Sequence, residues 1–387
     1  MIISPANRLD NVTEYYFSQK LQEIREMNLR GLNVINLGIG NPDMSPSEST
    51  LAKLIASAQN PKNHGYQGYK GIPELRKAIA DWYNKTYGVS LNSEQEILPL
   101  LGSKEGIMHI SMAFLNPGDE VLVPDPGYPT YSSVSNLVQA KIRTYDLDEN
   151  NNWFPDLKAL AATDLSKVKI MWLNYPNMPT GAKASDAMFK DVIAFAKQYK
   201  ILLCHDNPYS LILPDEAPKS ILSYEAAMDV AIELNSLSKS HNMAGWRVGW
   251  VAGGKEYIDT ILKVKSNVDS GMFLPVQHAA AESFNNTVEW HHRQNSEYEK
   301  RREKAWELLD ALNCQYDKHQ VGLFIWARVP DAIESVESYI DLFLQKATVF
   351  ITPGFIFGQN GNRYIRVSLC STVQAIEEAL ARIKKIL

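Results

Sequence analysis

Short apolar segments alternate with amphipathic helical segments through the middle of the chain, from about Glu96 to Ala252. The apolar segments are rich in Val, Ile, Leu and aromatic residues, and several are apolar almost throughout, which is typical of strands covered on both faces. They are EILPL, EVLVPD, KIRTYDL, KIMWLNY, ILLCHD, AIELNSL and RVGWVAG. Strands that alternate with helices predict an α/β domain, in which helices flank a mostly parallel, mixed sheet of about seven strands. Ligands bind to open sheets of this kind at the carboxyl ends of the strands.

The two ends of the chain follow a different pattern. A helical pattern over residues 12–30 leads into the short run VINLGIG, and a long polar helical pattern opens the C-terminal part. Three short strands follow that helix: LFIWARV, VFITPG and YIRVSLC. These patterns predict a large domain over residues 46–285 and a smaller α+β domain over residues 286–387. We expect the N-terminal segment, residues 1–45, to pack with the small domain.

Composition argues against several classes of function. The chain has 39 Lys and Arg residues against 44 Asp and Glu residues, so it lacks the basic excess that nucleic-acid binding normally requires. No apolar stretch approaches the ~18–20 residues of a membrane helix, and the first residues do not resemble a signal peptide, so we expect a cytoplasmic protein. Cys204, Cys314 and Cys370 are far apart and HExxH is absent, so we expect neither a disulfide framework nor a metal site.

The segment SLSKSHNMAGWRVGWVAG holds the strongest chemical signal. It places Lys239 directly after the predicted strand AIELNSL, at the edge of the sheet where ligands bind. A lysine in a pocket beside other cations loses proton affinity and becomes a nucleophile toward carbonyl groups. Ser236 and Arg247 in the same segment suit a phosphate group. A nucleophilic lysine beside a phosphate site is what pyridoxal phosphate requires. The alternative is an ordinary lysine on the surface.

A second candidate phosphate site lies in LGSKEGIMHISMAFLNPGD. Ser103 and Lys104 follow the predicted strand EILPL and open a helix. Backbone N–H groups and the positive end of the helix dipole favour an anion at such a junction. The alternative is that Ser103 only caps the helix.

Polar residues also follow the predicted strand ILLCHD. Asp206 ends this strand, and Tyr209 lies three residues later. A carboxylate at the base of the pocket can keep a pyridine nitrogen protonated, and a tyrosine hydroxyl can bond the phenolic oxygen of the same ring. A turn-forming aspartate is the alternative. His205 is expected on the other face of the strand, so we assign it no role.

The segment NRYIRVSLC places Arg366 in a predicted strand of the small domain. An arginine among apolar neighbours rarely persists without an anionic partner. The planar guanidinium suits the α-carboxylate of an amino acid. A structural ion pair is the alternative.

Taken together, these motifs resemble a known family over most of the chain. From about residue 12 onward the sequence is similar to the class I/II aminotransferases, which are pyridoxal-phosphate enzymes of fold type I. The motifs HGYQGYKGIPELR, LPLLGSKEGI, VPDPGYPTY and LNSLSKSHNMAGWRVGW most resemble those of LL-diaminopimelate aminotransferases and their relatives. The resemblance implies that the large domain binds pyridoxal 5'-phosphate.

Matching motif positions imply a role for each residue around the cofactor. Lys239 is implied as the Schiff-base lysine, which also carries the proton between substrate carbon and cofactor. Asp206 is implied to pair with the pyridine nitrogen, Tyr209 with the phenolic oxygen, and Tyr128 to stack on the ring. The residues implied to surround the phosphate are Ser103, Lys104, Ser236 and Arg247.

The resemblance also implies how substrate and partner bind. Arg366 matches the arginine that binds the substrate carboxylate, and Gly40 supplies a backbone contact to the same group. Tyr66 matches a tyrosine that reaches the phosphate of the other subunit, so we expect a homodimer with shared active sites. One position departs from the family pattern. Met178 stands where an asparagine usually donates a hydrogen bond to the phenolic oxygen of the cofactor, and methionine has no donor.

The activity implied is a transfer of an amino group by a ping-pong mechanism. The donor would be an L-amino acid (LL-diaminopimelate, methionine, an aromatic amino acid or similar), and the acceptor a 2-oxo acid such as 2-oxoglutarate. The alternatives are another reaction of fold type I, namely β-elimination or ring-forming elimination, and a non-catalytic protein that binds effectors.

Overall fold

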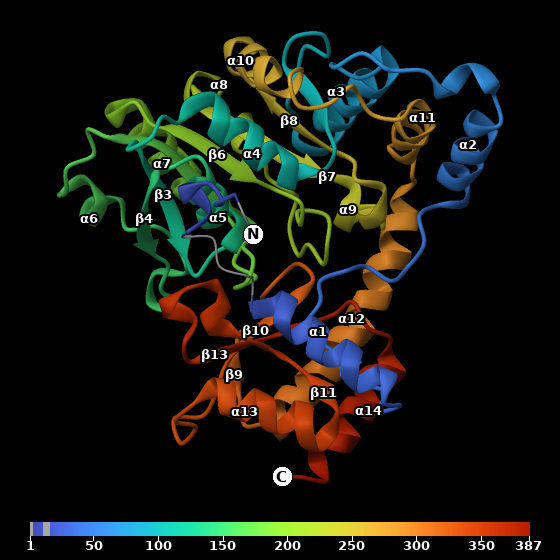
Figure 1. The fold of residues 1–387 in the computed structure, drawn as a ribbon, viewed down its shortest axis with the longest axis vertical. Coiled ribbons are helices and arrows are strands. Elements are labelled where there is room, and N and C mark those ends of the chain that lie inside the picture. The colour runs from blue at the N-terminus through green and yellow to red at the C-terminus, as the bar shows by residue number, and fades with distance from the viewer. Residues whose placement is uncertain (1–2, 11–15) are drawn as a thin grey trace.

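The structure, a computed structural model, describes residues 3–10 and 16–387. Figure 1 shows a broad sheet with its helices in the upper part of the molecule and a smaller group of strands and helices below it. The C-terminal elements make up the smaller group. The N-terminal helix α1 (Tyr16–Leu29) lies among these C-terminal elements.

The large sheet contains seven strands, all in the described part of the chain. In spatial order they are β2 (Ile97–Leu100), β8 (Gly249–Gly253), β7 (Ala231–Ser236), β6 (Leu202–Asp206), β5 (Val168–Asn174), β3 (Glu120–Asp125) and β4 (Lys141–Asp146). Neighbouring strands are parallel except at β8, which is antiparallel to β2 and to β7. Each predicted segment holds one of these strands, and the mostly parallel mixed sheet is confirmed.

Helices between residues 48 and 283 surround this sheet. They are α2 (Glu48–Ala58), α3 (Pro73–Tyr87), α4 (Ser103–Phe114), α5 (Pro129–Leu137), α6 (Leu157–Ala161), α7 (Asp186–Tyr199), α8 (Ala227–Val230), α9 (Leu237–Ser240), α10 (Lys255–Lys265) and α11 (Leu274–Ser283). Local signals set their ends: the Ser185 hydroxyl accepts a hydrogen bond from the Met188 amide at the start of α7, and α3 ends at Gly88. Within the described ranges, no helix has both the length and the apolar character needed to cross a membrane.

Each face of the large sheet carries its own apolar core, because alternate residues of a strand point to opposite faces. On β5, Met171 and Leu173 join the core that α3 and α7 complete, whereas Ile170 and Trp172 join the core of α4, α5 and α10. All four side chains are fully buried. Since helices cover both faces, the carboxyl ends of the strands are the part of the sheet left for a ligand.

The C-terminal part forms a smaller α+β unit. Its four-stranded antiparallel sheet has the order β12 (Thr352–Pro353), β13 (Tyr364–Ser368), β10 (Phe324–Arg328) and β9 (Gln315–Tyr316). Its helices are α12 (Val288–Ala311), α13 (Val336–Leu342) and α14 (Val373–Lys384). A separate parallel pair joins β1 (Ile35–Asn36) to β11 (Val349–Phe350).

The N-terminal segment packs against this smaller unit. Ile24, Met27 and Leu37 belong to the same apolar core as the buried residues of β10 and β13. Positions 12–15 of the predicted first helix lie outside the described residues, and α1 covers the rest of it except Arg30. These contacts support the proposed division into residues 1–45, 46–285 and 286–387.

Candidate active site

A cavity of about 490 Å³ lies where β5, β6 and β7 end and where the small sheet faces them. Ten of the eleven sequence-predicted site residues line it: Gly40, Ser103, Lys104, Tyr128, Asp206, Tyr209, Ser236, Lys239, Arg247 and Arg366. Tyr66 is the exception, because its side chain is 94% exposed and does not line the cavity of its own chain.

Lys239 reaches the cavity from α9, the short helix that follows β7. The hydroxyl of Ser236 caps this helix by accepting a hydrogen bond from the Ser238 amide at 3.1 Å. The Lys239 Nζ donates a hydrogen bond to the carbonyl oxygen of Gly40, which brings the N-terminal segment to the site. Burial lowers the pKa of Lys239, and the positive charges of Arg366 and Arg247 lower it further. A larger fraction of the amine is therefore unprotonated and nucleophilic.

Asp206 enters the cavity from the end of β6. Its Oδ2 accepts a hydrogen bond from the hydroxyl of Tyr131 at 2.9 Å. Its Oδ1 is buried and has no partner among the described residues. Burial raises the pKa of Asp206 to about 6, although the bond from Tyr131 acts in the opposite direction. A buried carboxylate oxygen without a partner is an acceptor for a cationic N–H donor on a ligand.

The N-terminus of α4 lies close to the side chain of Arg247. Gly102 precedes the helix with a φ of 88°, and a Cβ there would lie 2.1 Å from Nη2 of Arg247. On β8, a Cβ at Gly249 would lie 2.7 Å from the amide nitrogen of Ser103. Two glycines thus allow the guanidinium, the strand and the helix N-terminus to approach each other closely. Backbone N–H groups, a helix dipole and an arginine together suit a phosphate.

Arg366 lies on β13 with only 5% of its surface exposed. Its Nη2 donates a hydrogen bond to the carbonyl oxygen of Gly38 at 2.7 Å, and its Nε is buried and has no partner among the described residues. The guanidinium carbon lies 3.9 Å from the ring centre of Phe324 and 4.6 Å from that of Phe357. Burial lowers the pKa of Arg366 to about 10. No acidic side chain of the described residues pairs with it, which favours an anionic ligand over a structural ion pair.

Met178 lines the same cavity, and its sulfur lies 3.1 Å from Nη1 of Arg366. The neighbouring Asn177 points elsewhere: its Nδ2 donates to the carbonyl oxygen of Asn174, and its Oδ1 accepts from Thr180. The asparagine donor of the family pattern is therefore not replaced by its neighbour. Tyr209 also faces the cavity, and burial raises its pKa.

Sequence reasoning missed several residues of the site. Asn174 ends β5 and lines the cavity, with its Nδ2 bonded to the Asp206 carbonyl oxygen at 2.7 Å. The rule that ligands bind at strand ends could have identified it. Tyr131 follows Tyr128 by one helical turn, but its bond to Asp206 spans 75 residues. Phe324 carries no signal in the sequence that separates it from a core residue.

A second compartment of about 610 Å³ adjoins the first and shares Tyr128, Met178 and Arg366 with it. Its other walls are mainly apolar and aromatic: Tyr16, Phe17, Val123, Phe355, Ile356 and Phe357. The rings of Tyr16 and Phe355 meet edge to face with centres 5.2 Å apart. The side chain of Arg366 therefore lines both compartments.

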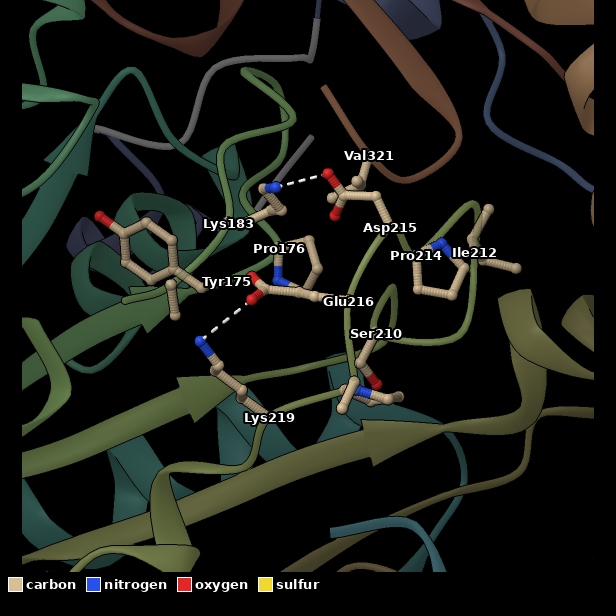
Figure 2. A pocket seen from close by; sticks show the side chains of 13 residues that line it. Tyr175, Pro176, Lys183, Ser210, Ile212, Pro214, Asp215, Glu216, Lys219 and Val321 are labelled. Carbon is tan, nitrogen blue, oxygen red and sulfur yellow. Dashed lines mark hydrogen bonds and ion pairs between the residues drawn. The ribbon is translucent and has the colours of Figure 1, made fainter. Parts of the chain in front are cut away.

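A third, much smaller cavity of about 30 Å³ lies away from the predicted residues (Figure 2). Two ion pairs lie at it, Lys183 with Asp215 at 2.6 Å and Lys219 with Glu216 at 3.4 Å. Its volume suits one or two water molecules rather than a substrate.

Comparisons with known proteins agree with this geometry. The sequence model of the family "Aminotransferase class I and II" matches residues 33–383. An LL-diaminopimelate aminotransferase of Dehalococcoides mccartyi is 41% identical over 379 residues, which cover 98% of this chain and 97% of the relative. The enzyme of the same name from Halothermothrix orenii is 39% identical over 380 residues, with 98% and 97% coverage.

Solved structures give the same result. Substrate-bound BacF of Bacillus subtilis superimposes with a TM-score of 0.94 at 36% identity, covering 100% of this chain and 98% of that one. An aminotransferase of Staphylococcus aureus superimposes with a TM-score of 0.89 at 31% identity and 99% coverage of both chains. The chain belongs to the class I and II aminotransferases, pyridoxal-phosphate-dependent enzymes of fold type I.

Proposed function

We propose that this aminotransferase takes the amino group from an L-amino acid with a large apolar side chain and passes it to a 2-oxo acid such as 2-oxoglutarate. The observation that carries the proposal is the aromatic compartment beside Arg366.

The cavity fits pyridoxal phosphate at three separate points. The unpaired Oδ1 of Asp206 suits the protonated ring nitrogen, and the junction of Gly102, Ser103 and Arg247 suits the phosphate. Lys239 lines the same cavity, and burial lowers its pKa. When bound, the cofactor supplies an electron sink that makes the α-proton of an amino acid acidic. Tyr128 would stack on its ring, and the remaining phosphate ligands would be Lys104 and Ser236.

Two residues act directly on the substrate in this proposal. Lys239 would remove the proton from the α-carbon and return it at the cofactor, because burial lowers the pKa of its amine. Arg366 would bind the α-carboxylate through its guanidinium: Nε has no partner among the described residues, and the present partner of Nη1 is the weakly accepting sulfur of Met178. The backbone of Gly40, which lines the same cavity, would contact the same group. Tyr209 would donate to the phenolic oxygen of the cofactor.

The side chain of the substrate would enter the second compartment. Its described walls carry only two charged groups, Arg366 and Asp125. Both carboxylate oxygens of Asp125 already accept backbone N–H groups, from Gln359 at 2.9 Å and Asn360 at 3.0 Å. Aromatic and aliphatic walls favour an apolar side chain such as that of phenylalanine, tyrosine or methionine.

Diaminopimelate is the second candidate donor, because relatives about 40% identical over nearly the whole chain bear its name. Its distal end carries a second ammonium and a second carboxylate. Each would need a partner in the compartment, or would lose hydration without compensation.

A panel of donors distinguishes the two candidates. Phenylalanine, tyrosine, methionine, LL-diaminopimelate, aspartate and alanine are each supplied with 2-oxoglutarate, and glutamate is measured. We expect kcat/KM for the apolar donors to exceed that for the charged donors at least tenfold, about 1.4 kcal/mol. Phe355→Ala should lower kcat/KM for phenylalanine but leave alanine unchanged, because alanine does not reach the compartment. Preference for diaminopimelate would refute the assigned side chain, and failure of every donor would refute the assigned activity.

We also propose a homodimer in which Tyr66 completes the site of the partner. Exposed apolar side chains support it: Tyr66, Tyr69, Leu101, Val268 and Phe273. The turn at Gly271 touches the backbone of Gln67, so two of the segments that carry these residues lie together. A cytoplasmic location is proposed as well, because all three cysteines are unpaired thiols.

Mixing inactive variants tests the shared site. Tyr66→Ala and Lys239→Ala each damage a different part of the site. If subunits share sites, a mixed dimer holds one intact site, and dissociation followed by reassociation of the two variants should restore up to a quarter of the activity. A mixture that stays inactive, or a fully active monomer by light scattering, would refute the shared site.

A further inference from the structure

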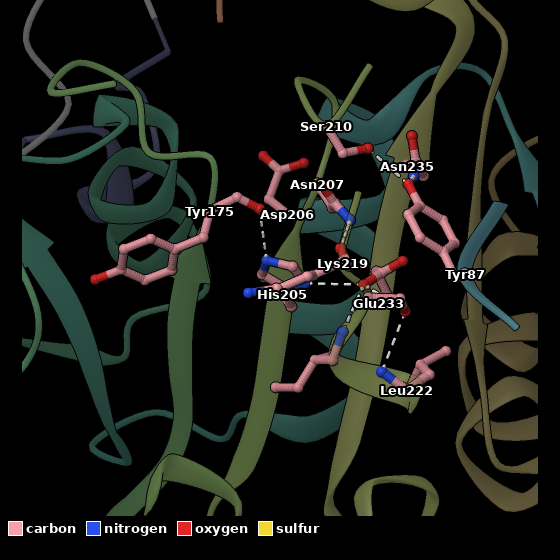
Figure 3. Close-up of polar contacts among 12 residues, drawn as sticks. Tyr87, Tyr175, His205, Asp206, Asn207, Ser210, Lys219, Leu222, Glu233 and Asn235 are labelled. Atoms are coloured by element: carbon pink, nitrogen blue, oxygen red, sulfur yellow. Dashed lines mark hydrogen bonds and ion pairs between the residues drawn. The ribbon is translucent and has the colours of Figure 1, made fainter. Parts of the chain in front are cut away.

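A buried histidine, His205, precedes Asp206 on β6 and points to the opposite face of the sheet. His205 is fully buried, and its Nδ1 lies 2.9 Å from Oε2 of Glu233 on the neighbouring strand β7. Its Nε2 lies 2.9 Å from the carbonyl oxygen of Tyr175. Figure 3 shows the ring between these two partners. The sequence predicts that His205 faces away from the cavity, and the structure agrees, but the ring sits in a polar network rather than in an apolar core.

The hydrogen-bond partners of His205 indicate which of its ring nitrogens carry a hydrogen. A carbonyl oxygen can only accept a hydrogen bond, so Nε2 must carry a hydrogen toward Tyr175. The protonation of Nδ1 then depends on Glu233. If the carboxylate is ionised, Nδ1 also carries a hydrogen, and the ring is an imidazolium.

Glu233 receives hydrogen bonds that favour an ionised carboxylate. Its Oε1 accepts from the hydroxyl of Tyr83 at 2.8 Å, and its Oε2 accepts from the hydroxyl of Ser220 at 2.9 Å and the amide of Ile221 at 3.2 Å. Both hydroxyl hydrogens point at Glu233, because each hydroxyl oxygen accepts a bond elsewhere: Tyr83 from the Trp250 indole at 3.3 Å, and Ser220 from the Leu222 amide at 3.1 Å. The oxygen that faces His205 thus accepts from two further donors, which favours an ionised carboxylate over a carboxyl proton on this oxygen.

We infer that His205 is an imidazolium paired with Glu233, and that it acts as a positioning residue that keeps its neighbour Asp206 ionised. His205 and Asp206 are consecutive on β6, so the imidazolium belongs to the residue next to the Asp206 carboxylate. Its counter-charge, Glu233, lies on the neighbouring strand β7. Asp206 needs such help, because it is buried and Tyr131 is the only donor to its carboxylate among the described residues. An un-ionised Asp206 could not stabilise a protonated ring nitrogen.

The electrostatics of Asp206 agree with this arrangement. The charge of His205 lowers the pKa of Asp206, and the opposing influence of Glu233 is weaker. The ionisable groups that face the pair are few. Tyr83 and Tyr87 of α3 face Glu233, Asp206 follows His205 on its own strand, and Lys239 lies on the cavity side of Asp206. From α7, His205 meets only the ring edge of Phe189, with centres 5.2 Å apart.

The affinity of the apoenzyme for pyridoxal phosphate, measured against pH, tests the inference. In His205→Gln the cation is lost and the pKa of Asp206 rises. Cofactor affinity should therefore fall at least tenfold near pH 6.5 and recover toward wild type near pH 8.5, one pKa unit corresponding to a factor of ten. A loss that is equal at both pH values would show that His205 only supports the fold, and would refute the inference.

Two controls separate charge from structure. Ser220→Ala removes one donor from Glu233 but no charge, so its cofactor affinity should keep the wild-type pH profile. In the background Asp206→Asn, the change His205→Gln should add no further pH dependence, because the group through which it acts is gone. A pH-dependent effect in that background would refute the route through Asp206.

Nitrogen-15 NMR of the wild-type holoenzyme tests the protonation state without any variant. Both ring nitrogens of His205 should resonate as protonated nitrogens and stay unchanged between pH 6 and 8.5. His205→Gln serves to assign the signals. Should that variant not fold, signals of a fully protonated, pH-insensitive histidine still support the inference, and their absence from the spectrum refutes it.

Discussion

The thioether sulfur of Met178 is the partner of one N–H group of Arg366, at 3.1 Å from Nη1. Sulfur is a weak acceptor, so this contact holds the guanidinium in place without competing strongly with a carboxylate. In the family pattern an asparagine occupies this position and donates to the phenolic oxygen of the cofactor. Met178 therefore differs from that asparagine in two ways. It contacts Arg366 as a weak acceptor, and it cannot donate to the phenolic oxygen of the cofactor.

Replacing Met178 with asparagine should change the titration of the bound cofactor. With methionine, the phenolic oxygen lacks the asparagine donor and becomes more basic. A lost hydrogen bond to a charged group is worth ~1.5–3 kcal/mol, and one pKa unit is ~1.4 kcal/mol. The pH midpoint of the change in visible absorbance of the holoenzyme should thus lie on the order of one pH unit higher in wild type than in Met178→Asn. Equal midpoints would mean that another group donates to the phenolic oxygen in wild type.

Asp206→Asn should change how the stability of the apoenzyme depends on pH. The folded pKa of Asp206 is raised to about 6 from its usual 3.8, so the folded state holds this proton while the unfolded state releases it. Stability of the wild-type apoenzyme should therefore fall as pH rises from 4 to 6, by ~2–3 kcal/mol at most. The asparagine variant should lack this fall, yet bind the cofactor more weakly. Urea unfolding at several pH values measures the difference, and parallel curves for the two proteins would contradict it.

Lys239→Ala should keep the cofactor but lose turnover. The phosphate site and Asp206 do not depend on the lysine, so pyridoxal phosphate should still bind, although more weakly. Turnover should fall by orders of magnitude, because nucleophile and base are one group. In wild type, borohydride should fix the cofactor on Lys239, as peptide mass spectrometry would report. A label on a different lysine would disprove the assignment.

Gly249→Ala should weaken cofactor binding by disturbing the phosphate site. The new Cβ would lie 2.7 Å from the Ser103 amide nitrogen, so β8 and the start of α4 must separate. Overpacking of this kind costs ~1–3 kcal/mol of stability, and the amide moves away from its anion. Gly245→Ala is the matched control, because nothing lies within 4 Å of a Cβ there. Fluorescence titration with pyridoxal phosphate should separate the two, and equal affinities would contradict this account of the site.

The large sheet and most of the cavity could be predicted from sequence because their signals are local. Apolar runs identify strands, and Lys239 and Asp206 stand at strand ends where the fold concentrates ligands. Residues that depend on distant contacts could not be found this way. Tyr131 matters through Asp206, and Phe324 through its stacking on Arg366. His205 shows the same limit, because alternation along β6 predicts its face but not the four-donor network around Glu233.

The pairing of β1 with β11 has a consequence for the order in which the protein can be completed. Ile35 pairs with Val349, more than 300 residues later in the chain. During synthesis the large sheet can form long before that partner leaves the ribosome, while the first strand waits without it. Gly38 and Gly40, which bond Arg366 and Lys239, follow directly on this strand. The part of the cavity that binds the substrate is therefore among the last parts to form. A chain that ends before residue 349 would carry the cofactor pocket but would lack the substrate-binding part of the cavity.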